Sequence, residues 1–268
     1  MASAFKFGNA QARNVGSDSR ISELMRYFEK EKPVSRSVCP KWDLTRVLLA
    51  ISGSPYEPVE LASRLDWSVK TAFLLALASA KRRGEIHALA ADGVFFDESG
   101  NSMTLAYEIS FLPKSQPSGS LPEPFQVPSL RDLPGSDESL CPVRAVRHYL
   151  NMTAGHRGDR KKLFIPAVGN GEVSKATISR WIALAVRRAY EGLSKQKLAS
   201  LRINAHEVRA VSTSWAFFNH LPLTNILNAA CWKSHSTFTR FYLRSMKIQS
   251  EDLYKLGPVV AASQIVQH

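Results

Sequence analysis

The chain has 268 residues, 44% of them hydrophobic, and its 35 lysines and arginines outnumber 23 acidic residues for a net charge of +12. This length allows one large core, and the basic surplus favours a polyanionic partner such as nucleic acid, although a basic solvated surface would give the same balance. Three widely spaced cysteines without a Cys-x-x-Cys pair argue against a disulfide framework or a zinc site, and the longest apolar run, residues 72–80, is too short to cross a membrane. We therefore expect a soluble intracellular protein with no membrane partner.

The first part of the chain is predicted to be irregular and then helical. Residues 1–20 are polar and lack periodicity, so we expect a mobile arm. Apolar residues at helical spacing in residues 21–30 predict a short amphipathic helix, which Pro33 ends before a linker. Three further helices are predicted: residues 44–51, residues 58–65 with Pro58 in the first turn, and residues 68–80 with Ser68 as the N-cap.

The periodicity then changes to that of strands and returns to that of helices. Residues 94–96 and 103–112 are predicted as two strands joined by the turn 97–101, and residues 125–128 as a third, edge strand. The later helices are expected at residues 141–150, after an N-cap at Ser174 with apolar positions from 178 to 189, and at 206–219, 223–231 and 236–246. The sequence thus predicts an α+β fold that is mainly α-helical, with one small antiparallel sheet.

The most informative chemical pattern is His206-Glu-Val-Arg209, followed 33 residues later by Tyr242. Residues three apart share one face of a helix, so His206 and Arg209 could together hold a phosphate oxygen and manage a proton. A tyrosine hydroxyl on a later helix could then attack that phosphate. The ordinary alternatives are a capping or core histidine beside a surface arginine, and a core tyrosine in a stripe with Phe238 and Phe241.

Other side chains could complete such a site. Arg82 could clamp a phosphate with Glu85 as its buried partner, because guanidinium stays charged and offers paired donors; a basic helix C-terminus is the alternative. Lys114 follows an apolar strand at a turn tip and could reach into a groove, or be merely solvated. Trp232 or His235 could donate a further hydrogen bond, or simply pack.

In this order, these residues resemble those of the tyrosine recombinases, also called the phage-integrase family. The resemblance covers residues 40–250. Residues 75–85 resemble the first arginine box, residues 110–115 the lysine hairpin and residues 206–216 the second box, while residues 231–243 are most similar to recombinases of eukaryotic DIRS-type retrotransposons. Trp232 precedes Tyr242 by ten residues and His235 by seven, which leaves open which of them fills the third box.

The resemblance implies site-specific cleavage and rejoining of DNA strands through a 3′-phosphotyrosyl intermediate, in recombination or integration of a mobile element, with no cofactor. Tyr242 would be the nucleophile and Lys114 the acid for the leaving 5′ oxygen. Arg82 and Arg209 would stabilise the transition state. His206 would assist proton transfer or donate a hydrogen bond to the phosphate, and Trp232 or His235 would be a further hydrogen-bond donor. The alternatives are a type IB-like topoisomerase and a noncatalytic DNA-binding remnant of a transposon recombinase.

The resemblance also implies an organisation and partners. The expected parts are an arm at 1–20, a linker helix at 21–38 that is a remnant of a core-binding domain, a catalytic domain at 39–250 and a tail at 251–268. Double-stranded DNA is the expected partner, and the tail is expected to join chains into a DNA-bound tetramer in the nucleus, or in the cytoplasm of a prokaryote. Candidate DNA contacts, which a solvated helix face would equally explain, are Arg83, Lys175, Arg180, Arg187 and Arg188.

Overall fold

The computed structural model describes residues 18–31, 42–112, 122–131, 135–201, 203–232 and 234–244. They fall in two units, residues 1–37 and 38–268. In the first unit the expected amphipathic helix is present as α1 (Ser19–Glu31). Its apolar residues Leu24, Met25 and Phe28 are exposed. The predicted arm, apart from residues 18–20, and the predicted tail lie outside the described residues. No helix in the described ranges has both the length and the apolar character needed to span a membrane.

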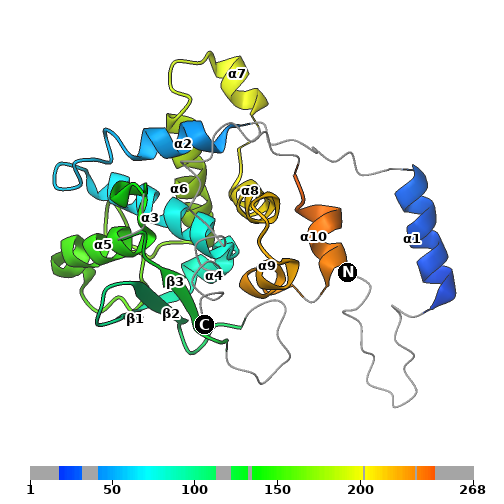
Figure 1. The fold of residues 1–268 in the computed structure, drawn as a ribbon, viewed down its shortest axis with the longest axis horizontal. Coiled ribbons are helices and arrows are strands. Elements are labelled where there is room, and N and C mark those ends of the chain that lie inside the picture. Colours follow the sequence, from blue (N-terminus) through cyan, green and yellow to red (C-terminus); the bar gives the residue numbers. More distant parts are fainter. Residues whose placement is uncertain are drawn as a thin grey trace. The chain divides into compact units, whose positions relative to one another are not determined.

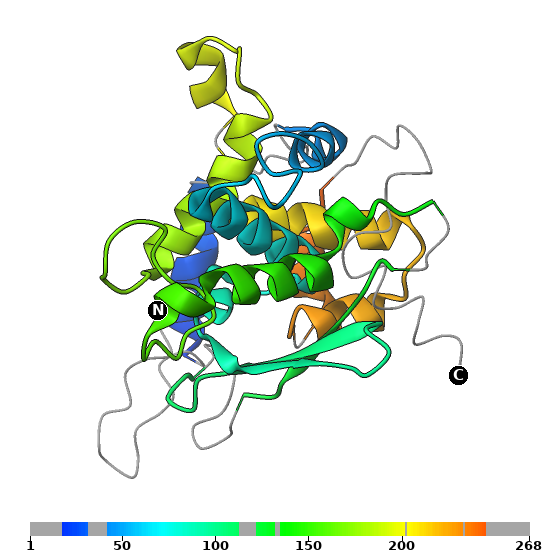
Figure 2. The same cartoon turned by 90° about the vertical axis from the view of Figure 1, so that its left-hand side faces the viewer.

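Four helices and the sheet contribute many residues to the main core of the second unit (Figures 1 and 2). The helices are α2 (Leu44–Ile51), α3 (Arg64–Ser79), α5 (Pro142–Arg157) and α6 (Lys175–Arg188). The predictions of α2, of α5 with proline in its first turn, and of α6 with Ser174 as its N-cap are confirmed. Helix α3 is buried along most of its length and contacts both α5 and α6.

The segment before α3 corrects two predictions. Residues 52–62 form turns rather than a helix beginning at Pro58, and α3 starts after Ser63. Ser63 Oγ accepts from the Asp66 amide at 3.2 Å, while the Ser63 amide donates to the Asp66 carboxylate at 3.1 Å. This reciprocal capping box fixes the helix start. Ser68 is therefore inside the helix, where its hydroxyl donates to the carbonyl of Arg64.

The sheet is antiparallel with strand order β1-β2-β3, as β1 (Leu89–Phe96), β2 (Ser102–Tyr107) and β3 (Phe125–Pro128). Val94 pairs with Leu105, and Met103 with Val127. The predicted third strand is therefore present at an edge. The second strand ends at Tyr107 rather than at Leu112, because the chain turns where the Phe111 amide donates to the carbonyl of Glu108.

The C-terminal helices are α8 (Ala205–Phe218), α9 (Leu223–Ala229) and α10 (His235–Phe241). The predicted third helix of this set extends too far, because the described α10 closes at Phe241. Two short helices were not predicted, α4 (Arg83–His87) and α7 (Lys195–Ser200), since so few residues carry no readable periodicity. In Figure 1, α8 lies between α3 and α10.

A second core cluster forms where α8, α9 and α10 meet. It contains Ala80, Ala210, Ala216, Leu221, Ile226, Ala230, Trp232, Phe238 and Tyr242. Helix α8 joins the two cores, because Val208 and Val211 belong to the main core while Ala210 and Ala216 belong to the second. The N-terminal part of α8, which carries His206 and Arg209, is thereby fixed against both cores.

Candidate active site

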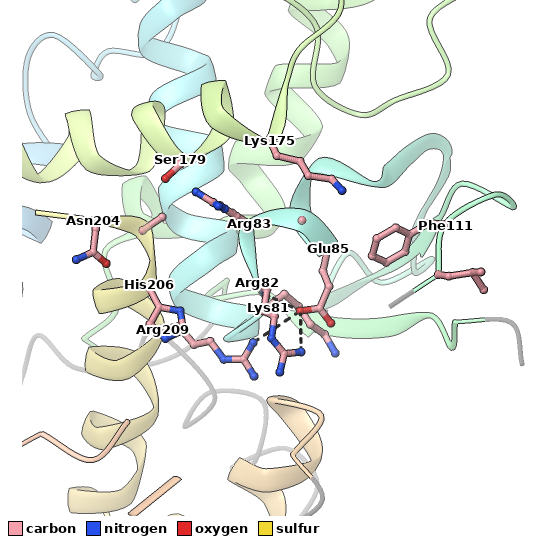
Figure 3. Close-up of a pocket in the computed structure, with 13 residues that line it drawn as sticks. Lys81, Arg82, Arg83, Glu85, Phe111, Lys175, Ser179, Asn204, His206 and Arg209 are labelled. Carbon is pink, nitrogen blue, oxygen red and sulfur yellow. Dashed lines mark hydrogen bonds and ion pairs between the residues drawn. The ribbon is translucent and has the colours of Figure 1, made fainter. Parts of the chain in front are cut away.

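A cavity of about 520 Å³ opens where the α3–α4 junction meets the first turns of α6 and α8 (Figure 3). Its lining includes one carboxylate, that of Glu85, and five cationic side chains: Lys81, Arg82, Arg83, Lys175 and Arg209. His206, Asn204 and Ser179 add neutral polar groups, and Phe111 and Leu112 close one side. Such an excess of positive charge in a concave site attracts an anion.

Arg82 and Arg209 converge on Glu85 (Figure 3). Glu85 Oε2 lies 3.8 Å from Arg82 Nη1 and 3.7 Å from Arg209 Nη1, and it accepts the Arg82 amide at 2.7 Å. Glu85 is only 5% exposed, so its prediction as a buried partner is confirmed. The alternative interpretation of Arg82 as part of a basic helix C-terminus is wrong: α3 ends at Ser79, Ala80 adopts the left-handed conformation, and Arg82 precedes α4.

Arg209 is buried without a full set of acceptors. It is 2% exposed, its Nη2 donates to the carbonyl of Ala230, and its Nε and Nη1 have no hydrogen-bond acceptor among the described residues. Burial, and then the charge of Arg82, lower the pKa of Arg209 to about 10. The guanidinium therefore keeps its proton at neutral pH, although burying an incompletely paired charge is costly.

Tyr242 belongs to the second core cluster and lies beside Arg209. Its ring centroid is 4.8 Å from that of His206, 4.3 Å from that of Trp232 and 5.3 Å from the Arg209 guanidinium carbon. The interpretation of Tyr242 as a core residue is thus partly correct, because it is 7% exposed and Phe238 shares its cluster. Phe241 does not belong to that stripe and is 54% exposed.

Of the two candidates for the third box, the structure places Trp232 beside the cluster. The Trp232 ring lies 4.8 Å from the Arg209 guanidinium carbon, and its buried Nε1 has no hydrogen-bond partner in the described part of the chain. His235 is exposed at the first position of α10. Cys231, which has φ +50°, turns the chain between α9 and Trp232.

His206 is in the first turn of α8, where the Asn204 side chain caps the helix by accepting the Glu207 amide at 2.9 Å. The histidine as a whole is exposed, but its ring lies against Tyr242. Partial burial of this ring, and then the charge of Arg209, lower the pKa of His206 below its usual value. The neutral imidazole can therefore accept a proton at physiological pH.

The remaining predicted residues are placed in several ways. Lys114 lies outside the described residues. Arg83 is exposed, and Figure 3 shows its side chain directed toward Ser179, away from Glu85. Lys175 lines the cavity, and Arg180 and Arg187 are exposed on α6. Arg188 forms an ion pair with Asp66, and its guanidinium lies over the Tyr56 ring.

Lys81 was not predicted from the sequence, yet it lines the cavity. It is 7% exposed, its Nζ donates to Cys231 Sγ at 3.1 Å, and it lies over the Phe125 ring at 4.8 Å. Its position in the run Lys81-Arg82-Arg83 was the only available signal. Within the described ranges, no group of three His, Cys, Asp or Glu residues is placed to hold a metal ion.

Comparisons with known proteins bear on the fold. No protein-family model and no curated protein matches the sequence. The structure resembles the crystal structure of XerA recombinase, with a TM-score of 0.50 and 16% identity over 84% of this chain and 70% of that one. It also resembles XerH site-specific recombinase bound to its difH substrate in a pre-cleavage complex, with a TM-score of 0.52 and 12% identity over 90% of this chain and 64% of that one. These likenesses confirm the predicted fold: the chain has the mainly helical α+β fold of a tyrosine-recombinase catalytic domain, with a small antiparallel sheet.

Proposed function

We propose that this chain cleaves and rejoins DNA strands at specific sites through a 3′-phosphotyrosyl intermediate, with Tyr242 as the nucleophile. The finer parts of the proposal are an origin in a DIRS-type mobile element, a nuclear location, and a DNA-bound tetramer joined by residues 251–268. The first of these rests on the resemblance of residues 231–243, and the other two follow from the same family resemblance.

The observation that carries the proposal is a set of buried donors without acceptors around a tyrosine. Arg209 Nε, Arg209 Nη1 and Trp232 Nε1 are buried and lack hydrogen-bond partners among the described residues. Leaving a buried donor unpaired typically costs about 1–3 kcal/mol, so native proteins keep few of them. A bound anion would satisfy the three donors beside the Tyr242 ring, and a phosphate diester offers the complementary charge and two nonbridging oxygens that can accept from them.

The proposed chemistry assigns one role to each group. The Tyr242 oxygen bonds to phosphorus as the bond from phosphorus to the 5′ oxygen breaks, and neutral His206 takes the phenol proton. Arg82 and Arg209 stabilise the charge that grows on the nonbridging oxygens, held in place by the shared carboxylate of Glu85. Trp232 Nε1 donates a further hydrogen bond, and Lys114 protonates the leaving oxygen. The 5′ hydroxyl of a second strand then reverses the step.

A covalent complex tests this function. The protein is incubated with a nicked duplex that loses its cleaved end, so that rejoining is blocked, and the mixture is resolved on a denaturing gel. A protein–DNA adduct that survives denaturation, together with exchange of strands between two duplexes, supports the proposal. Binding without an adduct would identify a noncatalytic DNA-binding remnant. Relaxation of one supercoiled DNA without exchange would identify a topoisomerase.

The pKa of His206 predicts a pH dependence of DNA binding. Because burial and Arg209 hold this pKa below the usual 6.5, His206 is neutral in the free protein at pH 7. A bound phosphate favours the protonated ring, so affinity rises as the pH falls from about 7.5 to about 6, while cleavage, which needs the neutral ring to accept the phenol proton, falls over the same range. Fluorescence anisotropy at constant ionic strength measures the slope. His206→Gln should abolish it, and an unchanged slope in that variant would contradict the assignment.

Salt should weaken DNA binding steeply, because cationic side chains displace counterions from the phosphates they contact. The exposed residues Arg180 and Arg187 are expected to contribute, so replacing either with alanine should reduce the slope of log affinity against log salt by about 1. Glu172→Gln, which loses only an exposed ion pair with Lys162, is the control for a general charge effect. A flat salt response of the unchanged protein would contradict a nucleic-acid partner altogether.

A further inference from the structure

The position of Tyr242 depends on contacts beyond its own helix. Helix α10 has seven residues, too few to be stable alone. It closes where the amides of Tyr242 and Leu243 both donate to the carbonyl of Phe238, each at 2.9 Å. Tyr242 therefore stands at the point where the chain leaves the helix, so contacts made by the residues that follow help to hold its backbone in place.

One hydroxyl of α8 anchors the backbone on both sides of this exit. Ser214 is fully buried, and its Oγ donates to the carbonyl of Tyr242 at 3.1 Å. The same Oγ accepts the amide of Arg244 at 2.7 Å. The carbonyl of the proposed nucleophile and the amide two residues later are thus fixed to the helix that carries His206 and Arg209.

A bidentate salt bridge between Arg244 and Glu207 strengthens this attachment. Arg244 Nε lies 3.0 Å from Glu207 Oε1, and Arg244 Nη2 lies 3.4 Å from Glu207 Oε2. The two side chains are 13% and 17% exposed, so solvent screens the pair only partly. The remaining nitrogen, Nη1, donates to the carbonyls of Phe241 and Leu243 at 3.1 and 3.3 Å. Glu207 is the immediate neighbour of His206 in α8.

We propose that Glu207, Ser214 and Arg244 form a clamp that positions Tyr242 for attack on a phosphate held by His206 and Arg209 of the same chain. The inference rests on the proposed function and adds three positioning residues to it. Displacing a reacting group by about 1 Å can cost about 10²-fold in rate, which is the size of the effect we expect from opening the clamp.

The clamp differs from the packing that holds α10 in place. Phe238 is fully buried in α10, and its ring lies 5.5 Å from that of Phe217 and 5.8 Å from that of Trp232. These apolar contacts do not involve the clamp residues. Breaking the ion pair should therefore let Tyr242 move while α10 stays attached and the phosphate-binding groups stay in place.

The test measures single-turnover cleavage of the nicked duplex at saturating full-length protein, for Arg244→Gln and for Ser214→Ala. Glu172→Gln is the control, because it removes an ion pair with Lys162 instead. A second arm repeats each substitution in a Tyr242→Phe background, with hydrogen peroxide supplied as the nucleophile. There the peroxide oxygen bonds to phosphorus as the 5′ oxygen leaves, so the rate reports the pocket without its tyrosine.

We expect cleavage by Tyr242 to slow about 10²-fold in both variants, with DNA affinity and peroxide-dependent cleavage unchanged. The charge-exchanged pair Glu207→Arg with Arg244→Glu should recover part of the rate lost in Arg244→Gln. Equal losses in the two arms would overturn the clamp, since the residues would then be supporting the pocket itself. Undiminished cleavage by Tyr242 would also overturn it. If the unsubstituted protein forms no adduct, the proposed function fails and the clamp fails with it.

Discussion

Tyr242→Phe is expected to abolish the covalent protein–DNA adduct while DNA affinity and the melting temperature stay unchanged. The substitution removes one oxygen and keeps the ring that contacts Trp232 and His206. Loss of a nucleophile that acts together with its partners lowers rates by about 10⁴-fold or more. The measurement is adduct yield on a denaturing gel, with binding followed separately by anisotropy.

Tyr107→Phe is the matched control. This second tyrosine lies close enough to Glu85 and Arg209 for their charges to act on it, and burial, followed by the charge of Glu85, raises its pKa well above the usual value. It is thus a poorer source of phenolate than an ordinary tyrosine. Adduct formation should survive Tyr107→Phe; if the adduct instead survives Tyr242→Phe and is lost here, the nucleophile has been assigned to the wrong residue.

The sequence was sufficient where the determining contacts are local. Periodicity placed α2, α6 and α8, and the spacing of His206 and Arg209 correctly predicted one face of a helix. The start of α3 is also readable, because Ser63 and Asp66 have the spacing of a capping box, and the predicted N-cap at Ser68 is five residues too late. Ser68 has Thr71 three positions later, which offers no carboxylate for a reciprocal capping box.

Other features depend on contacts between distant residues and could not be read from the sequence. The Lys81 ammonium donates a hydrogen bond to the sulfur of Cys231, which lies 150 residues later in the chain. Trp232 rather than His235 lies beside Tyr242, because the Trp232 ring packs against the Arg209 guanidinium of α8 while His235 is exposed. The sequence does not distinguish Arg188 from its exposed neighbours on α6, but in the structure Arg188 forms an ion pair with Asp66 of α3. In each case a tertiary partner decides the role of the residue.

Arg209→Ala and Arg82→Ala are expected to reduce cleavage far more than binding. Their guanidinium groups meet at Glu85 beside the donors that lack acceptors, where charge would develop as phosphorus becomes pentavalent. Removing one such donor typically costs about 2.7–4 kcal/mol, or about 10²–10³ in rate. The measurement is the single-turnover rate at saturating DNA, compared with the dissociation constant. Arg83→Ala is the control, because this exposed neighbour points away from Glu85.

Stability separates a catalytic Arg209 from a structural one. The free protein buries this charge with two nitrogens that lack acceptors, and Glu85 would keep Arg82 as a partner if Arg209 were removed. Arg209→Met preserves much of the volume and removes the buried charge, so its melting temperature should equal or exceed that of the unsubstituted protein while cleavage is lost. A residue retained for stability would behave in the opposite way. A marked fall in melting temperature, with losses in cleavage and affinity of equal size, would show that Arg209 mainly supports the fold.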